Sequence, residues 1–402
     1  MNTNDRLPTL RAIDIVPIRR PTGEMALALR DPTQLSPQTL VISPAGYLVL
    51  MHLDGRHTVA DVQAAYRKHA GWAISEAEVG NVVRALDEAL LLAGPRAEAA
   101  LAQRRAEYAA APVRDSRAGH PEPGLLRQEI ETMIRRGVAA PVRDVRGLIA
   151  PHLDYARGAP CYADAYATLG ASPPADRFVI LGTNHSGCAR SAVATRKDFA
   201  TPLGLAPVDR EFLRRLVSRL GYDLCLNEAD HRVEHSIELQ VHILQVLLDG
   251  RPFEIVPILC PDVAGPSGTL PADGEGPDLS DVAVALGELA AGDGRRTVII
   301  AAADLSHVGQ RFGDDEPTTT AFLEAVAKSD RALLDLLEQR REEEFVAELR
   351  TSQNRTRICS SGCIYAVLRA LPRHPCRVLG YHQAVDFESE TSVTCAAAVI
   401  GQ

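Results

Sequence analysis

The larger part of the chain, residues 125–402, alternates short apolar runs with longer segments of helical periodicity. The runs "RGLIAPH", "RFVILGTNH", "FEIVPILC" and "RTVIIAAADLSH" are predicted to be buried strands. Between them, segments such as "DREFLRRLVSRL" and "DVAVALGELAA" repeat apolar residues every three or four positions, which predicts helices. This alternation is typical of an α/β fold with a central sheet and helices on both of its faces.

Residues 1–93 follow a different pattern of shorter elements. "TLVISPAGYLVLMHLDG" alternates like strands joined by turns, and "RHTVADVQAAYRKHAG" has helical spacing. Ser75 and Glu78 form a capping-box pattern at the start of another helix. We predict a small winged-helix-like α+β domain here, followed by a helical and flexible linker over residues 94–124 that is rich in Ala and Arg and then in Pro.

Composition narrows the class of protein. The 402 residues are 46% hydrophobic and 24% charged, and the net charge is −9, with eight cysteines. This balance predicts a folded protein and argues against nucleic acid or an anionic membrane as a partner. Without a signal peptide or a long apolar segment, we expect a cytoplasmic protein with free thiols. Nucleotide-binding loops and a serine triad are also not indicated.

Three of the four predicted strands are followed by a histidine, namely His152, His185 and His307. Ligands of α/β sheets bind beyond the carboxyl ends of the strands, so these imidazoles converge if the strands run in one direction. A single histidine after a strand is more often an ordinary turn residue. Three of them together indicate a site.

A cysteine supplies the fourth part of this predicted site. Cys359 precedes "SSG" and an apolar helix, and a helix N-terminus favours the thiolate form. Two imidazoles and one thiolate suit iron(II), copper or zinc, and leave coordination positions open for a substrate. Cys363 lies one turn further along, and either cysteine could instead be a buried apolar residue.

The segment "DHRVEHSIELQVHILQVLL" is predicted to be one mostly buried helix. Its period places His231, His235, Glu238 and His242 on one narrow stripe. His231 and His235 could bind a metal as an i, i+4 pair. We favour the alternative, in which this stripe forms a pocket wall that hydrogen-bonds ligands or substrate.

Seven segments, taken in order over residues 125–402, resemble the Memo family, which is also called AmmeMemoRadiSam system protein B. They are "APHLDY", "LGTNHSG", "FATPLGLAPVD", "HRVEHSIELQ", "DLSHVGQRF", "NRTRICSSGCI" and "ESETSVTCAA". The family is similar in fold to the class III extradiol ring-cleaving dioxygenases. The resemblance therefore implies an α/β metal-binding domain whose metal ligands would be His152, His185 and Cys359.

The same resemblance implies the roles of further residues. His307, with Asp304 beside it, would act as acid and base, and His235 would line the pocket. Two motifs depart from the family pattern, since "PHLDY" replaces "PHAGY" and "CSSGCI" replaces "CGxxPI". The second change leaves open whether Cys359 or Cys363 is the ligand.

Partners are implied only by resemblance. The family name refers to neighbouring genes, which implies radical-SAM and AMMECR-type partner proteins. Residues 1–93 resemble a PqqD-like peptide-recognition domain, which implies binding of a peptide or partner protein; the alternative is an accessory domain that packs against the rest.

We expect one transition metal per chain, iron(II) or copper in preference to zinc, serving a redox or dioxygenase-like reaction on an unidentified small molecule or peptide. A thiolate in place of the usual carboxylate ligand argues against ring cleavage itself. Two alternatives remain: a metal- and partner-binding protein without catalysis, and a zinc-dependent hydrolase.

Overall fold

The chain divides into two compact units, Met1–Ala110 and Ala111–Gln402. The computed structural model describes residues 2–20, 22–36, 38–117, 121–185, 187 and 189–402. Part of the stretch predicted to be flexible, residues 118–120, lies outside the described residues. The predicted domain limits at 93 and 124 stay predictions.

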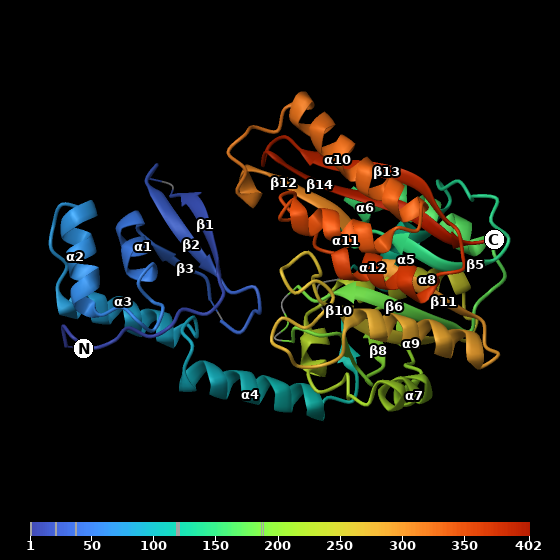
Figure 1. Cartoon of the computed structure of the whole chain (residues 1–402), viewed down its shortest axis with the longest axis horizontal. Helices are drawn as coiled ribbons and strands as arrows, with labels where there is room; N and C mark the ends of the chain where they lie inside the picture. Colours follow the sequence, from blue (N-terminus) through green and yellow to red (C-terminus); the bar gives the residue numbers. More distant parts are fainter. Residues whose placement is uncertain (1, 21, 37, 118–120, 186, 188) are drawn as a thin grey trace. The chain divides into compact units, whose positions relative to one another are not determined.

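The described residues of the first unit form a small antiparallel sheet in the order β1–β2–β3 and four helices. The predicted small α+β unit is therefore confirmed (Figure 1). Its elements are β1 (Asp14–Arg19), β2 (Met25–Arg30), β3 (Leu40–Ile42), α1 (Pro44–Leu50), α2 (Val59–His69), α3 (Glu76–Glu88) and α4 (Pro95–Ala110).

Local chemistry explains where two of these helices begin. At α3 the predicted capping box is present, because Ser75 accepts from the backbone N–H of Glu78 and the Glu78 carboxylate accepts from the N–H of Ser75. The prediction of strands over "PAGYLVL" was wrong, since this segment is α1. Ser43 caps that helix, and Pro44 occupies its first turn, where the missing N–H costs nothing.

The second unit is built on a sheet that joins eight described strands in the order β12–β14–β5–β11–β6–β10–β7, with β13 paired to β14. The four predicted strands, β5, β11, β6 and β10, run parallel to one another. The strands are β5 (Val145–Ala150), β6 (Arg177–Thr183), β7 (Val193–Ala194), β10 (Glu254–Cys260), β11 (Thr297–Ala302), β12 (Asp304–Gly309), β13 (Cys376–Asp386) and β14 (Thr391–Gly401).

Helices cover both faces of this sheet, which confirms the predicted α/β architecture (Figure 1). Helices α6 and α8 pack on one face with α5 against them, and α12 packs on the other with α9 against it. The helices are α5 (Pro123–Ile134), α6 (Tyr155–Gly170), α7 (Arg210–Leu220), α8 (Ser236–Leu248), α9 (Leu279–Gly292), α10 (Thr320–Glu338), α11 (Glu342–Thr351) and α12 (Ser361–Ala370). None of the helices we describe has both the length and the apolar character needed to span a bilayer.

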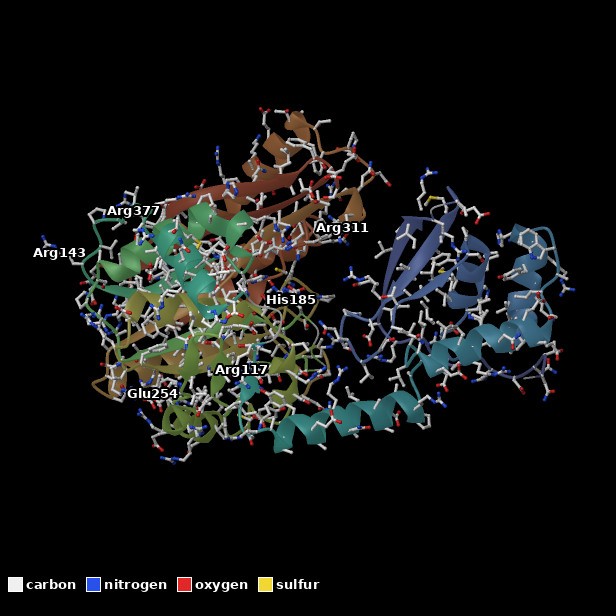
Figure 2. The ribbon with its side chains drawn as sticks, turned by 180° about the vertical axis from the view of Figure 1, so that it is seen from behind. Arg117, Arg143, His185, Glu254, Arg311 and Arg377 are labelled. Carbon is white, nitrogen blue, oxygen red and sulfur yellow. The ribbon has the colours of Figure 1, made fainter. Side chains whose placement is uncertain are left out.

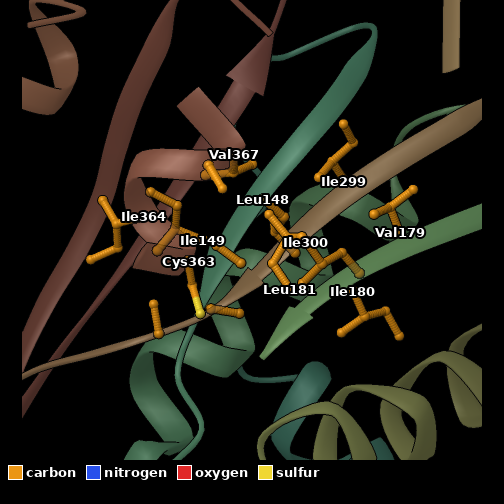
Figure 3. Close-up of a cluster of buried hydrophobic side chains, with 14 of the residues drawn as sticks. Leu148, Ile149, Val179, Ile180, Leu181, Ile299, Ile300, Cys363, Ile364 and Val367 are labelled. Carbon is orange, nitrogen blue, oxygen red and sulfur yellow. The ribbon is translucent and has the colours of Figure 1, made fainter. Parts of the chain in front are cut away.

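Apolar side chains of the parallel strands form the core of this unit. Every residue of β6 and β11 is buried, as expected for parallel strands covered on both faces. Figure 3 shows side chains of β5, β6, β11 and α12 packed together. Because the four strands are parallel, the residues that follow them gather at one edge of the sheet.

A buried carboxylate joins α10 to the sheet. Asp330 is fully buried and accepts hydrogen bonds from the hydroxyls of Ser306, Thr394 and Tyr381 at 2.6, 2.6 and 2.9 Å. Burial raises the pKa of Asp330 above its usual value, although these hydrogen bonds oppose the shift.

This shift predicts a pH dependence of stability. A raised pKa means that folded chains keep a proton that unfolded chains have already lost, so the contribution of Asp330 to stability falls as pH rises from about 4. We expect the stability of the wild type relative to Asp330→Asn to decrease as pH rises above about 4, until Asp330 is ionised in the folded chain as well, measured by urea unfolding at a series of pH values. A difference that is constant across this range would contradict the prediction.

Candidate metal centre

His152 lies two residues beyond the end of β5 and is 3% exposed. Its Nδ1 is 3.0 Å from the carbonyl oxygen of Ala302, which can only accept, so Nδ1 carries the proton. Nε2 is then the ring nitrogen that could bind a metal, and it is 3.5 Å from Sγ of Cys359 and 3.4 Å from a carboxylate oxygen of Asp304. His152 therefore offers Nε2 as a metal ligand beside a thiol and a carboxylate.

His185 lies two residues beyond the end of β6, and 30% of its side chain is exposed (Figure 2). Its Nδ1 donates to the Glu234 carboxylate, with oxygens at 3.0 and 3.1 Å, so Nε2 is the ring nitrogen that a metal could bind. Its ring centre is 4.9 Å from that of His152. A histidine held by a carboxylate through one ring nitrogen is a common arrangement for binding a metal through the other.

The position of Glu234 follows from the close approach of α8 to β6. At Gly182 in β6, a side chain would collide with Ser236 and Ile237, the first residues of α8. The turn before α8 thus lies beside the residues after β6. There the Glu234 carboxylate also accepts from the backbone N–H groups of His185 and Ser236. Burial would raise the pKa of Glu234, but His185 holds it well below its usual range.

Cys359 lies two residues before α12 and is partly exposed. Burial would raise the pKa of its thiol, but the charges and hydrogen bonds of His152 and His185 outweigh that effect and lower it to about 6. The pKa of His185 is in turn raised well above its usual value; burial opposes this, but Cys359 and Glu234 outweigh it. The side chain of Cys359 is thus disposed to be a thiolate, the form that binds metals.

The ligand atoms of His152, His185 and Cys359 lie within 4.8 Å of one another. They form a possible metal-binding group, and they are the three residues predicted as ligands from the sequence. The donor set of two imidazoles and one thiolate fits a transition metal such as iron, copper or zinc.

Asp304 adjoins this group. It is 2% exposed, and one of its oxygens accepts from the backbone N–H groups of His152 and Leu153 at 3.0 and 3.3 Å. Burial raises the pKa of Asp304 to about 6, although the charge of His307 and the two N–H groups oppose the shift.

His307 lies within a strand, which corrects the prediction that it ends one. β11 stops at Ala302, and the next residues form β12 on the edge of the sheet, where His307 pairs with Val393 of β14. Its Nδ1 is 3.1 Å from the carbonyl oxygen of Leu305. Burial lowers the pKa of His307, and the charge of Asp304 opposes that shift.

His235 faces the same region from the position just before the first residue of α8. Its ring stacks on that of His185 at 5.3 Å, and 55% of its side chain is exposed. With His185 and Glu234 it forms a second possible group of metal ligands. The predicted role of His235 in lining a pocket stays a prediction.

The prediction of one long helix around His235 was wrong at its start. Residues Glu228–Arg232 form a 3-10 helix, and α8 begins only at Ser236. His231 therefore does not pair with His235; it is buried, and its Nε2 contacts the carbonyl oxygen of Val193 at 3.0 Å.

Cys363 lies in the core, not in the group of ligands. Figure 3 shows its sulfur among apolar side chains of the sheet and α12. Its Sγ is 3.7 Å from Oγ1 of Thr183, and burial raises the pKa of its thiol well above the usual value. The geometry favours Cys359 over Cys363 as the ligand. All seven cysteines in the described ranges are free thiols, and Cys188 lies outside those ranges.

Sequence reasoning missed Glu234. Its signal was present, because an acidic residue lies directly beside His235 in "VEHS". In the continuous helix that we predicted, Glu234 lies off the polar stripe. In the structure α8 begins at Ser236, two residues after Glu234.

The loop that carries Cys359 is held in an unusual backbone conformation. Gln353, Asn354 and Arg357 have φ of 54°, 46° and 58°, in the left-handed region. The side chain of Asn354 accepts from the N–H of Ile358 at 2.9 Å and donates to its C=O at 3.0 Å. Asn354 thus fixes the residue that precedes Cys359.

Replacing Asn354 by alanine is expected to lower the free energy of unfolding by about 2 to 3 kcal/mol, through two lost hydrogen bonds and the poorer fit of alanine to a left-handed backbone. Gln353→Ala is the matched control, because it changes the same kind of backbone position outside this pair of hydrogen bonds. Denaturant unfolding measures both. Equal losses in the two variants would refute the role of the Asn354 side chain.

The family of this chain follows from its similarity to known proteins. A protein-family model described as "Memo-like protein" matches residues 120–400. The chain belongs to the Memo family. The predicted resemblance is therefore confirmed. The group of His152, His185 and Cys359 lies within the residues that match the Memo model.

Individual Memo proteins are also similar to this chain. A MEMO1 family protein of Aquifex aeolicus is 28% identical over 355 residues, covering 87% of each chain. The MEMO1 family protein TTHA0924 of Thermus thermophilus is 29% identical over 343 residues, covering 84% of this chain and 97% of that one. MK0963 of Methanopyrus kandleri is 36% identical over 166 residues, 40% of this chain and 53% of its own. The second unit, Ala111–Gln402, is shorter than either of the first two matches, so both of them extend into the first unit.

Proposed function

We propose that this Memo protein binds one transition-metal ion, iron(II) or copper, through Nε2 of His152, Nε2 of His185 and Sγ of Cys359. One observation carries the proposal: both imidazoles have Nδ1 engaged by an acceptor, Ala302 or Glu234, so that Nε2 remains available beside a thiolate. A bound iron or copper ion would supply redox chemistry and open positions for a small-molecule substrate.

The surrounding residues support an enzyme-like site. On the buried side, Asp304 borders His152, and His307 follows on the same strand; we assign proton transfer to these two groups. On the exposed side, His235 stacks on His185, and we assign it contact with the substrate. The substrate would thus enter from the His185 and His235 side and meet the proton-transfer groups beyond the ligands.

Metal analysis of full-length protein purified without oxygen tests the proposal. We expect about one iron or copper per chain, followed by oxygen consumption when a catechol or another oxidisable small molecule is added. Zinc at full occupancy with hydrolytic activity would favour the hydrolase instead. A chain that retains no metal after reconstitution with iron(II), copper or zinc would refute the site.

A second candidate is a metal- and partner-binding protein without turnover, which the surface of the first unit favours. Within the described residues, β1 and β3 each pair only with β2, which leaves two strand edges open. Exposed apolar side chains occur in the same unit: Met25, Val41, Tyr47, Met51 and Trp72. Such edges can accept a peptide as an added strand.

Trp72 allows this candidate to be tested in the full chain, because it is the only tryptophan. Radical-SAM and AMMECR-type proteins, the partners implied by the family name, would be titrated while Trp72 emission is followed. Saturable changes together with inert, tightly held copper would favour this candidate. Catalytic turnover without any partner would count against it.

A further inference from the structure

Arg114 is a buried arginine in β4 (Arg114–Asp115), four residues after the first unit ends at Ala110. Only 3% of the residue is exposed, and its guanidinium lies 5.0 Å from the ring centre of Phe199. β4 pairs with β8 (Phe199–Thr201), so the backbone of Arg114 is fixed as well. Such a costly burial of charge requires compensating contacts.

Among the described residues, the hydrogen bonds of the guanidinium all go to one short segment beside the metal centre. Nε donates to the carbonyl oxygen of His231 at 3.1 Å, and Nη2 donates to that of Glu234 at 2.5 Å. Nη1 donates to the Glu238 carboxylate, which completes a buried ion pair. One planar guanidinium therefore ties together the 3-10 helix, the turn and the first turn of α8.

This segment carries the group that holds His185. Glu234 is fixed at its backbone by Arg114, while its carboxylate accepts from Nδ1 of His185. Displacement of the Glu234 backbone would therefore turn its carboxylate away from His185. In addition, the carbonyl oxygens of His231 and Glu234 would lose their partner in a buried environment.

We propose that Arg114 is a positioning residue of the metal centre, acting on His185 through Glu234. The proposal rests on the metal site proposed above, but the contacts from Arg114 to His185 exist in the chain without a metal. It follows that the segment which leads out of the first unit is itself a structural part of the site. Within the part of the chain that the structure describes, Arg114 contacts none of the three proposed ligands, His152, His185 and Cys359, directly.

Replacement by lysine separates charge from geometry. Arg114→Lys can keep an ion pair with Glu238, but a single ammonium cannot reproduce the three divergent donors of the guanidinium. We expect the variant to bind cobalt(II), used here as the probe metal, about tenfold more weakly, at the lower end of the effect of losing a hydrogen-bond partner of a metal ligand.

Arg177→Lys is the matched control. Arg177 is also buried; it bonds Asp209, Asp293 and Thr297 and lies 4.6 Å from the ring centre of Phe212. It starts β6, so it lies at the opposite end of the strand from His185. Both lysine variants should unfold at lower temperature than the wild type, and only the Arg114 variant should lose metal affinity.

A second readout does not depend on metal. In the metal-free chain, the proton on Nδ1 of His185 should give a downfield NMR signal that Glu234 protects from exchange with water, assigned by its loss in His185→Gln. Arg114→Lys should broaden or remove this signal, and Arg177→Lys should retain it. Should Arg114→Lys not fold, Phe199→Leu loosens the same guanidinium while keeping its hydrogen-bond partners, and a smaller change in the same direction is expected.

The outcomes are distinct. Equal behaviour of the Arg114 and Arg177 variants in both readouts would overturn the proposal and leave Arg114 a structural residue only. If the wild type binds no metal, the proposed function fails, and the His185 signal alone decides the role of Arg114.

Discussion

Replacing Cys359 by serine is expected to weaken metal binding by more than about 100-fold, beyond the range seen when only a hydrogen-bond partner of a ligand is lost. Serine removes the only thiolate of the group, and its hydroxyl stays protonated where the thiol of Cys359 has a pKa of about 6. Titration of the metal-free protein with iron(II) or cobalt(II) in the absence of oxygen measures this loss.

Cys363→Ser is the natural control for that experiment. It lies one helical turn away in the core, so the same change should leave metal affinity intact. It should instead cost stability, by about 1 to 3 kcal/mol, because a hydroxyl replaces a thiol in apolar surroundings. Retained affinity in Cys359→Ser with lost affinity in Cys363→Ser would overturn the assignment of the ligand.

Replacing Glu234 by alanine is expected to weaken metal binding by about 10- to 100-fold. His185 would lose the acceptor that fixes its ring and keeps its proton on Nδ1. Glu234→Gln should have a smaller effect, because its amide oxygen can still accept from Nδ1 but carries no charge. The same metal titrations measure both variants.

Asp209→Ala controls for the loss of a buried carboxylate. Asp209 is 4% exposed, bonds Arg177 and caps α7, and so lies away from the ligand group. Its replacement should lower stability while leaving metal affinity unchanged. If Glu234→Ala binds metal as tightly as the wild type, the carboxylate does not support His185.

The parts of the site that follow from strand direction could be predicted from the sequence. Continuous apolar runs followed by His152 and His185 indicate parallel strands whose ends meet, and the structure brings these imidazoles within contact of each other. Cys359 could be predicted as a further member of the site because "CSSGCI" marks the start of an apolar helix. In each case one local pattern fixed both the element and the place of the side chain.

The remaining parts of the site depend on the residues at which helices and strands begin, and the periodicity of apolar residues does not determine these. The real helix begins six residues later than predicted, which places Glu234 in the turn that holds His185 and not on the flank of a helix. A break of one residue after Ala302 turned "DLSHVG" into an edge strand, with His307 inside it. Arg114 could not be foreseen, because its partners lie more than 100 residues away in sequence.

The position of β14 has a consequence for biosynthesis. This strand lies between β5 and β12, so the edge of β5 that precedes His152 stays bare until residues 391–401 have been made. At ordinary rates of translation this delay is on the order of tens of seconds. Throughout that time the nascent chain exposes a hydrophobic strand edge, the kind of edge that can pair with other chains.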